Sequence, residues 1–169
     1  MAKLQILFYP SPVIRKKSLP VTSINGDLQR LIDDMVETMY AAPGVGLAAP
    51  QVGALKRVIV MDAQEDRKST RLLTLINPEI VAADGKIVEE EGCLCLPGLK
   101  EEVTRFKRVV VKAHGRNEKE IVLEGSGLLA RILQHEIDHL NGVLFIDRLS
   151  TAKRELVKRR LKKAAKEQG

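Results

Sequence analysis

The sequence has no tryptophan, and aromatic residues make up only 3% of its 169 residues. A hydrophobic core must therefore be built mainly from aliphatic side chains, and a hydrophobic fraction of 44% is enough to form one. No apolar run reaches the roughly 18 residues that a transmembrane helix needs, and residues 1–5 lack the apolar stretch of a secretory signal. These absences predict a cytoplasmic protein of one domain, with no membrane association.

Cysteine is also scarce, since the chain has only Cys93 and Cys95. A separation of two positions disfavours a disulfide between them, because such a bond demands a specific geometry. Thiols stay reduced in the cytosol, so both are better interpreted as groups available for chemistry or for metal binding.

The net charge of +6 is concentrated at one end of the chain. Residues 150–169 contain eight basic and two acidic residues, whereas residues 1–149 contain 20 of each. We therefore expect a neutral body over residues 1–149 and a basic C-terminal helical extension of the same domain over residues 150–169.

Three segments have helical patterns. Apolar residues recur with helical period over residues 28–39, and Asn25 or Asp27 can cap this helix. A second helix is expected over residues 126–140, and a strongly basic third helix over residues 151–166. The apolar face of the third helix is expected to consist of Leu149, Ala152, Leu156, Leu161 and Ala164.

Between these helices lie short segments that favour strands. The turn signal Asp84-Gly85 predicts that residues 86–91 return antiparallel to residues 79–83. Residues 44–53 are rich in glycine and residues 62–70 are polar, so both are predicted to be loops. Short connections favour antiparallel pairing, and we expect an α+β fold with antiparallel sheets packed around the helix of residues 126–140. The other predicted strands are 57–63, 72–77, 109–113 and 120–123.

The second helix contains the motif HExxH, formed by His135-Glu136-Ile137-Asp138-His139. Four residues are slightly more than one helical turn, so the two imidazoles point the same way, about 40° apart, and can bind one metal ion. Glu136 lies beside that face and can reach a water on the metal. Leu128 and Ile132 continue the histidine stripe at helical spacing, as a hydrophobic pocket beside a metal would require.

A catalytic zinc-type site needs three protein ligands and an open position, and this helix offers two. No histidine follows His139, so the third ligand must come from elsewhere. The segment Glu91-Gly92-Cys93-Leu94-Cys95 supplies thiolates, and on an extended segment its two cysteines face the same side. A reduced cysteine is more often a small buried apolar residue, but the nearby HExxH motif favours metal binding here.

Three separated segments resemble the signature motifs of the peptide deformylase family. Residues 44–51 match its glycine-hydrophobic-glycine-hydrophobic-Ala-Ala-any-Gln motif, and residues 91–94 match its Glu-Gly-Cys-hydrophobic motif. Residues 134–142 match its Gln-His-Glu-any-any-His-Leu-any-Gly motif. One departure is Cys95, because the family usually has serine two positions after the ligand cysteine.

The resemblance implies a metallo-hydrolase domain over residues 1–149 that removes the formyl group from N-terminal formyl-methionine of new polypeptides. Cys93, His135 and His139 would bind one divalent metal, with Fe2+ first and Zn2+, Ni2+ or Co2+ as alternatives. A metal-bound hydroxide would attack, with Glu136 as general base and then acid. The Gln51 amide and the Leu94 backbone N–H would stabilise the oxyanion.

The same resemblance implies a substrate site and a supporting ion pair. Substrate-binding residues would be Gly44, Val45, Gly46, Leu128, Arg131 and Ile132, although the family often has an apolar residue at the position of Arg131. Glu91 and Arg105 would form an ion pair that fixes the Cys93 loop. The partners would be N-formyl-methionyl peptides and the ribosome, the latter through the basic helix; a terminal helix that is merely solvated is the alternative.

Two other functions remain open at the level of sequence. A metalloprotease that cuts internal peptide bonds would act on unformylated peptides. A basic RNA- or ribosome-binding module with a structural metal would need Cys95 as a fourth ligand, because structural zinc sites are closed by four protein ligands.

Overall fold

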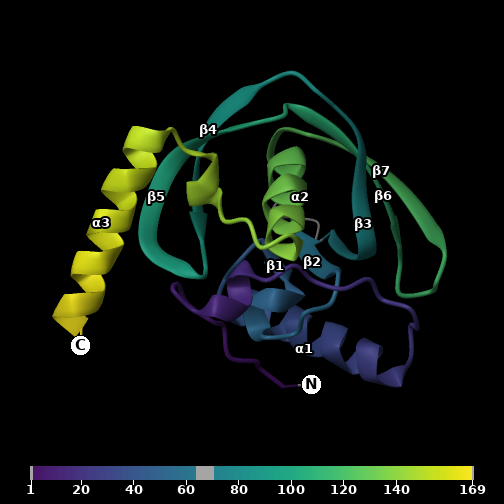
Figure 1. The fold of residues 1–169 in the computed structure, drawn as a ribbon. Coiled ribbons are helices and arrows are strands. Elements are labelled where there is room, and N and C mark those ends of the chain that lie inside the picture. The colour runs from purple at the N-terminus through teal and green to yellow at the C-terminus, as the bar shows by residue number, and fades with distance from the viewer. Residues whose placement is uncertain (1, 64–70, 169) are drawn as a thin grey trace.

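A computed structural model describes residues 2–63 and 71–168, and it confirms the expected α+β class (Figure 1). The predicted loop of residues 62–70 lies mostly outside these ranges. The described helices are α1 (Gly26–Ala41), α2 (Gly127–Leu140) and α3 (Thr151–Gln168), with short 3-10 helices η1 (Pro12–Arg15), η2 (Ala49–Val52) and η3 (Phe145–Arg148). The strands are β1 (Gly46–Ala48), β2 (Val58–Asp62), β3 (Leu72–Asp84), β4 (Ile87–Cys93), β5 (Leu96–Arg105), β6 (Arg108–His114) and β7 (Glu120–Ser126).

The strands form two antiparallel sheets. One has the order β1-β2-β3-β6-β7, and the other is the hairpin β4-β5. β3 runs through Pro78, and its pairing with β6 shifts between Ile76 and Glu79, since proline has no N–H to donate. The two predicted strands of residues 72–77 and 79–83 are therefore one irregular strand.

The prediction that residues 86–91 return along residues 79–83 is wrong. β4 pairs with β5 instead, and the facing edge of β3 is occupied by β6. Gly85 has a positive φ of 72°, but the chain continues from β3 into the second sheet and does not fold back along β3. The sequence did not predict β5, because Pro97 and Gly98 near its beginning are residues that disfavour strands. The predicted loop of residues 44–53 also contains a strand, β1, which pairs with β2.

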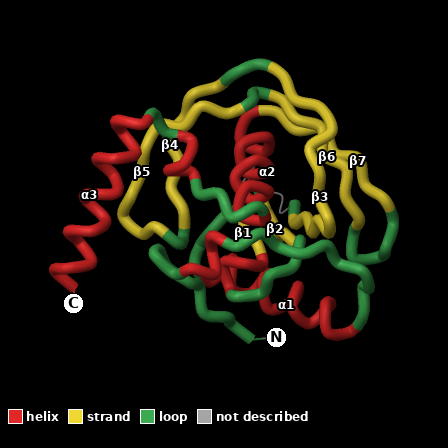
Figure 2. The backbone as a smooth tube through the Cα atoms, viewed as in Figure 1, coloured by secondary structure: helices red, strands yellow, loops and turns green. Residues whose placement is uncertain are grey.

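Helix α2 lies in the centre of the fold, between the β4-β5 hairpin and the larger sheet (Figure 2). Its buried apolar residues, including Leu133 and Ile137, join a core cluster with Ile59, Leu75 and Val111 from the strands. Asn141 and Gly142 end the helix as predicted, and Gly142 has φ 74°. A side chain at Gly142 would collide with the Arg15 carbonyl oxygen at 2.2 Å, so glycine is required on both grounds.

Helix α3 lies along the outer side of the β4-β5 hairpin, and α1 lies below β1 and β2 (Figure 1). The Asn25 side chain accepts a hydrogen bond from the Leu28 N–H at 3.0 Å, so Asn25 is the cap of α1. Helix α3 packs on the body through Val157, which is buried with Leu149 and Leu161 against Phe145.

The predicted apolar face of α3 is therefore partly wrong. Leu156 is 58% exposed, and Ala152 and Ala164 are exposed as well. Val157 takes the buried position because it lies four residues before Leu161 and so on the same side of the helix. Across the described part of the chain, no helix has the length and apolar character required to traverse a lipid bilayer.

Candidate metal and substrate site

Three side chains from two elements converge at the centre of the molecule. His135 and His139 lie one turn apart on α2, and Cys93 ends β4. The Nε2 atoms of the two histidines are 3.2 Å apart, and the Cys93 Sγ lies 3.3 Å from the His139 Nε2. The ligand atoms of the three residues all lie within 4.8 Å of one another. The HExxH helix and the cysteine segment therefore meet as expected from the sequence.

A carboxylate holds the outer nitrogen of one histidine. The His135 Nδ1 lies 3.0 Å from Glu91 Oε1, which leaves the His135 Nε2 directed at Cys93 and His139. Such a partner fixes the tautomer and the orientation of a ligand imidazole. Burial raises the pKa of the Glu91 carboxyl, but hydrogen bonds from His135 and Arg105 outweigh it and lower the pKa to about 2.

Glu91 belongs to a buried ionic network. Arg105 donates from Nε and Nη2 to the two Glu91 oxygens at 2.9 and 3.0 Å, so the ion pair expected between these residues is present. Arg105 also donates from Nη1 to Asp138 at 2.6 Å. Arg148 donates to both oxygens of Asp138, at 3.1 and 2.7 Å. The network thus joins α2, β4, β5 and η3 around the histidines.

The role of Asp138 was not predicted from the sequence. Asp138 occupies an unspecified position of the HExxH pattern, and it is 7% exposed. Gln134 is a second supporting residue on α2, because its amide accepts from the Phe106 N–H and donates to the Phe106 carbonyl, both at 2.9 Å. These contacts hold α2 against the end of β5. Gln134 was indicated only as the first residue of the Gln-His-Glu motif, and the signal for Asp138 was its polar character on a helix that is otherwise apolar.

Glu136 is buried, with 4% of its surface exposed. Its Oε1 atom is buried and has no hydrogen-bond partner among the described residues. Burial raises the pKa of the Glu136 carboxyl to about 7. Gly46 packs directly against this side chain, since a Cβ at residue 46 would lie 2.8 Å from Glu136 Oε2. The conformation of Glu136 therefore requires that residue 46 of β1 be glycine.

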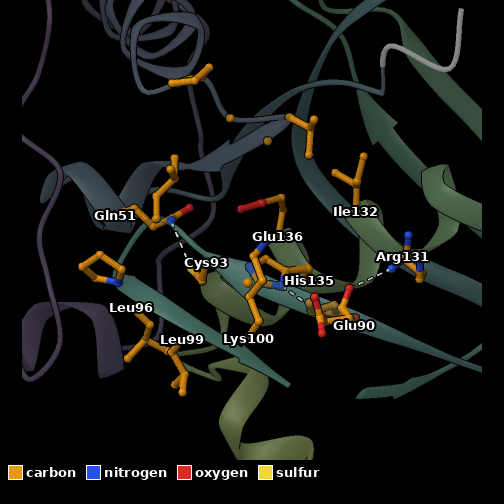
Figure 3. Close-up of a pocket in the computed structure, with 18 of the residues that line it drawn as sticks. Gln51, Glu90, Cys93, Leu96, Leu99, Lys100, Arg131, Ile132, His135 and Glu136 are labelled. Carbon is orange, nitrogen blue, oxygen red and sulfur yellow. Dashed lines mark hydrogen bonds and ion pairs between the residues drawn. The ribbon is translucent and has the colours of Figure 1, made fainter. Parts of the chain in front are cut away.

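The Gln51 amide has a defined orientation. Its Oε1 accepts a hydrogen bond from the Ala48 N–H at 2.8 Å, which turns the Nε2 toward the Cys93 Sγ, 3.7 Å away. Gln51 is 1% exposed and sits in η2, so the glycine-rich segment places a fixed amide donor beside the Cys–His–His group (Figure 3).

A cavity of about 600 Å³ opens onto this group. Every residue predicted for catalysis, substrate binding or metal binding lines it, except His139, which is 1% exposed behind the others. Ile132 and Arg131 lie on one side of the cavity, and Arg131 donates to the Glu90 carbonyl at 3.4 Å (Figure 3). The structure adds residues from the start of β5, which the sequence did not indicate because this strand was missed. The predicted lining residues are Gly44, Val45, Gly46, Gln51, Cys93, Leu94, Leu128, Arg131, Ile132, His135 and Glu136, and those added by β5 are Leu96, Pro97, Gly98, Leu99 and Lys100.

Cys95 lies next to the group but is not part of it. Cys93 pairs with Leu96 in the hairpin register, so Leu94 and Cys95 form the turn between β4 and β5. The Sγ atoms of Cys93 and Cys95 are 3.1 Å apart. The hydrogen bond with Cys95, together with burial, raises the pKa of the Cys93 thiol to about 11. The group of possible metal ligands consists of Cys93, His135 and His139, without Cys95. A structural zinc site closed by four protein ligands would need Cys95 as well, so the geometry favours a site with three protein ligands.

The residues present fit a divalent metal. One thiolate and two imidazoles are ligands that borderline metals such as Zn2+ and Fe2+ accept, and three ligands leave a coordination position for water. The buried Glu136 Oε1 has no hydrogen-bond partner among the described residues, so it is free to accept a proton from such a water. Three metal ligands, a nearby carboxylate and an adjoining cavity are together typical of metal-dependent hydrolases.

Comparison with known proteins agrees with this class. The family profile described as Polypeptide deformylase matches residues 3–155. A peptide deformylase of Thermodesulfovibrio yellowstonii is 56% identical over 162 residues, covering 96% of this chain and 98% of the relative. The peptide deformylase of Syntrophobacter fumaroxidans is 52% identical and covers 99% of this chain and 98% of its own length.

Solved structures extend the likeness to the fold. The crystal structure of a peptide deformylase from Legionella pneumophila matches with a TM-score of 0.89 and 47% identity, covering 99% of this chain and 98% of that one. A peptide deformylase from Ehrlichia chaffeensis, solved in complex with actinonin, matches with a TM-score of 0.90 and 38% identity, covering 97% and 98%. The chain belongs to the peptide deformylase family, whose members are hydrolases.

Proposed function

We propose that this chain removes the formyl group from the N-terminal formyl-methionine of newly synthesised polypeptides, with one divalent metal bound by Cys93, His135 and His139. The observation that carries the proposal is the meeting of these three ligands at one end of a cavity, beside the unpartnered Glu136 oxygen. Fe2+ is the proposed metal, because the family resemblance favours it and the ligand set suits it; Zn2+, Ni2+ and Co2+ suit the same ligands.

The metal, when bound, lowers the pKa of a water that it holds, so that hydroxide is available near neutral pH. Glu136 takes the proton of the attacking water and returns it to the departing amine. Its raised pKa, about 7, suits both steps, because the carboxyl exchanges a proton readily near neutral pH.

The developing negative charge on the formyl oxygen needs donors. Gln51 Nε2 is held toward Cys93 by the contact of its Oε1 with the Ala48 N–H, so it is oriented before substrate binds. The Leu94 backbone N–H, next to the ligand cysteine, is the second proposed donor. Removing one such donor typically raises the barrier by about 3 kcal/mol.

The methionine side chain is proposed to enter the apolar part of the cavity, between Val45, Leu128 and Ile132. β1 is an edge strand of its sheet, since only β2 pairs with it. The backbone of Gly44 and Gly46 beside that edge can therefore bind the substrate main chain as an added strand. Main-chain pairing tolerates different residues after methionine, and Arg131 contributes its charge at the rim of the cavity.

The C-terminal helix is proposed to contact the ribosome, and the protein is proposed to be cytoplasmic, where new chains emerge. Arg160 and Lys153 each lie 3.6 Å from Glu101 on β5, whereas most other basic residues of α3 are exposed. This proposal treats residues 150–169 as a basic extension of the catalytic domain, and the packing of Val157 against the body supports it. Exposed cations on one helix are suited to the phosphates of ribosomal RNA.

The proposed activity is tested by formate release from a formyl-methionyl tripeptide, using protein purified without oxygen and loaded with Fe2+. Wild type is expected to release formate, and Glu136→Gln is expected to be at least about a hundredfold slower while binding the same amount of metal. The unformylated tripeptide serves as a control. Cleavage of that control at an internal bond would favour the metalloprotease alternative and contradict the proposal.

A further inference from the structure

We propose that Cys95 is a resolving thiol for Cys93, so that oxidation by hydrogen peroxide yields a reversible Cys93–Cys95 disulfide in place of an overoxidised Cys93. This inference concerns the two thiols alone and does not depend on the substrate of the enzyme. It assigns a role to the residue at which the chain departs from the usual serine of the family.

The turn between β4 and β5 makes the disulfide feasible. Residues two apart on an extended strand have Cα atoms about 6.6 Å apart, at the upper limit of disulfide geometry. Here Cys93 pairs with Leu96, so Leu94 and Cys95 turn the chain and bring the two sulfurs to 3.1 Å. Only a further approach to the S–S bonding distance of about 2.05 Å is needed.

The two thiols differ in their access to an oxidant. Cys93 lines the cavity of about 600 Å³, whereas Cys95 is fully buried and does not line it. Cys95 packs with Leu96, Val103 and Phe145 in an apolar cluster. Hydrogen peroxide that enters the cavity can therefore contact the Cys93 sulfur directly, whereas the Cys95 sulfur is accessible only to Cys93.

The chemistry proceeds in two steps. The Cys93 sulfur attacks one peroxide oxygen, the O–O bond breaks, and the sulfur becomes a sulfenic acid while one water leaves with the thiol proton. The Cys95 sulfur then attacks the Cys93 sulfur, the S–O bond breaks, and a second water leaves with the Cys95 proton. Two thiols lose two electrons and two protons, and one hydrogen peroxide is reduced to two waters.

The consequence for the metal site is reversible inactivation. A disulfide removes the thiolate at Cys93, and two imidazoles alone are a weak site. A thiol reductant restores both sulfurs by exchange, whereas a sulfinic acid at Cys93 would be irreversible in the absence of a dedicated repair enzyme. Serine in place of Cys95 cannot condense with the sulfenic acid, so it offers no such protection.

To test this, reduced, metal-free protein is treated with one equivalent of hydrogen peroxide and digested with trypsin, and the peptide masses are measured by mass spectrometry. Both cysteines fall in the peptide of residues 87–100. We expect this peptide to lose the mass of two hydrogen atoms and to regain it with dithiothreitol. Zinc binding, measured by titration, should fall at least about tenfold on oxidation and return on reduction.

Cys95→Ser is the matched control, and its peptide should gain the mass of oxygen atoms at Cys93 without recovering zinc binding. A wild-type peptide that gains oxygen while Cys95 stays free would overturn the proposal. A disulfide that joins two chains, seen as a peptide pair of twice the mass, would overturn it as well. The wild-type result decides the matter even if the variant does not fold.

Discussion

The Nδ1 of His135 lies 3.0 Å from a Glu91 oxygen, which is in turn bound by the buried Arg105 guanidinium. One carboxylate therefore sets the orientation of a ligand histidine and neutralises a buried cation. Glu91 lies two residues before Cys93 on β4, so it also ties the cysteine segment to α2. Glu91 therefore helps to hold Cys93 and His135 in the positions from which they can bind a metal.

Replacement of Glu91 by glutamine should destabilise the protein by about 3 kcal/mol at neutral pH, because it removes one partner of a buried ion pair. The pKa of Glu91 is lowered from its ordinary value of 4.5 to about 2, so the stability that it contributes is fully present above pH 4.5. That stability is lost as the pH falls toward about 2. Urea denaturation of both proteins across this range measures the effect.

The difference in unfolding free energy between wild type and Glu91→Gln should shrink as the pH falls through that window. A difference that stays constant from pH 4.5 to about 2 would show that the carboxylate is not held ionised by Arg105 and His135.

Replacement of Gly46 by alanine should lower kcat/KM about a hundredfold, because small misplacements of a catalytic group have effects of this size. The new Cβ would lie 2.8 Å from Glu136 Oε2 and 3.0 Å from its Cγ, so the carboxylate must move. Steady-state kinetics on a formyl-methionyl peptide measure the change. Gly26→Ala is the control, since its Cβ would meet the tip of Arg30 at an ordinary 3.6 Å. Equal loss in both variants would contradict the account.

Helix α3 should bind ribosomes through its exposed cations. Deleting all of residues 152–169 would remove the buried Val157 and so disturb the fold, which makes charge removal the better test. Glutamine at Lys158, Arg159, Lys162 and Lys163 should weaken ribosome binding at least about tenfold and reduce its salt dependence, with peptide deformylation unchanged. Sedimentation with ribosomes at several salt concentrations measures this.

The matched control for α3 removes four exposed lysines elsewhere, namely Lys16, Lys17, Lys56 and Lys119. Both variants lose the same net charge, so a similar decrease in ribosome binding would mean that overall charge, and not the helix, determines the affinity.

The parts of the site that the sequence predicted came from local spacing and from the family resemblance, and the resemblance supplied the pairing of Glu91 with Arg105 and of Cys93 with the two histidines. Two histidines four apart on a helix must share a face, and this spacing placed His135 and His139 correctly. The role of Gln51 came from the motif of residues 44–51, and its amide is oriented by the Ala48 N–H only three residues away. Contacts between residues three or four apart are set by local backbone geometry and do not depend on how distant segments pack.

The parts that were not predicted depend on contacts distant in sequence that no motif of the family resemblance specified. β4 pairs with β5 and β3 pairs with β6, and no local pattern carries that information. The bond between Arg105 and Asp138 joins residues 33 apart, and Asp138 stands where the motif allows any residue. Val157 is buried in place of Leu156 because it packs with Leu149 and Phe145, a contact that the composition of a basic helix does not specify.

The most direct test of the account is the X-ray absorption spectrum of the Fe2+-loaded protein, prepared without oxygen. We predict one sulfur ligand and two imidazole nitrogens per metal, with a water-type oxygen as the fourth ligand, and loss of the sulfur contribution in Cys93→Ser. Two sulfur ligands, or a metal bound without sulfur, would contradict it.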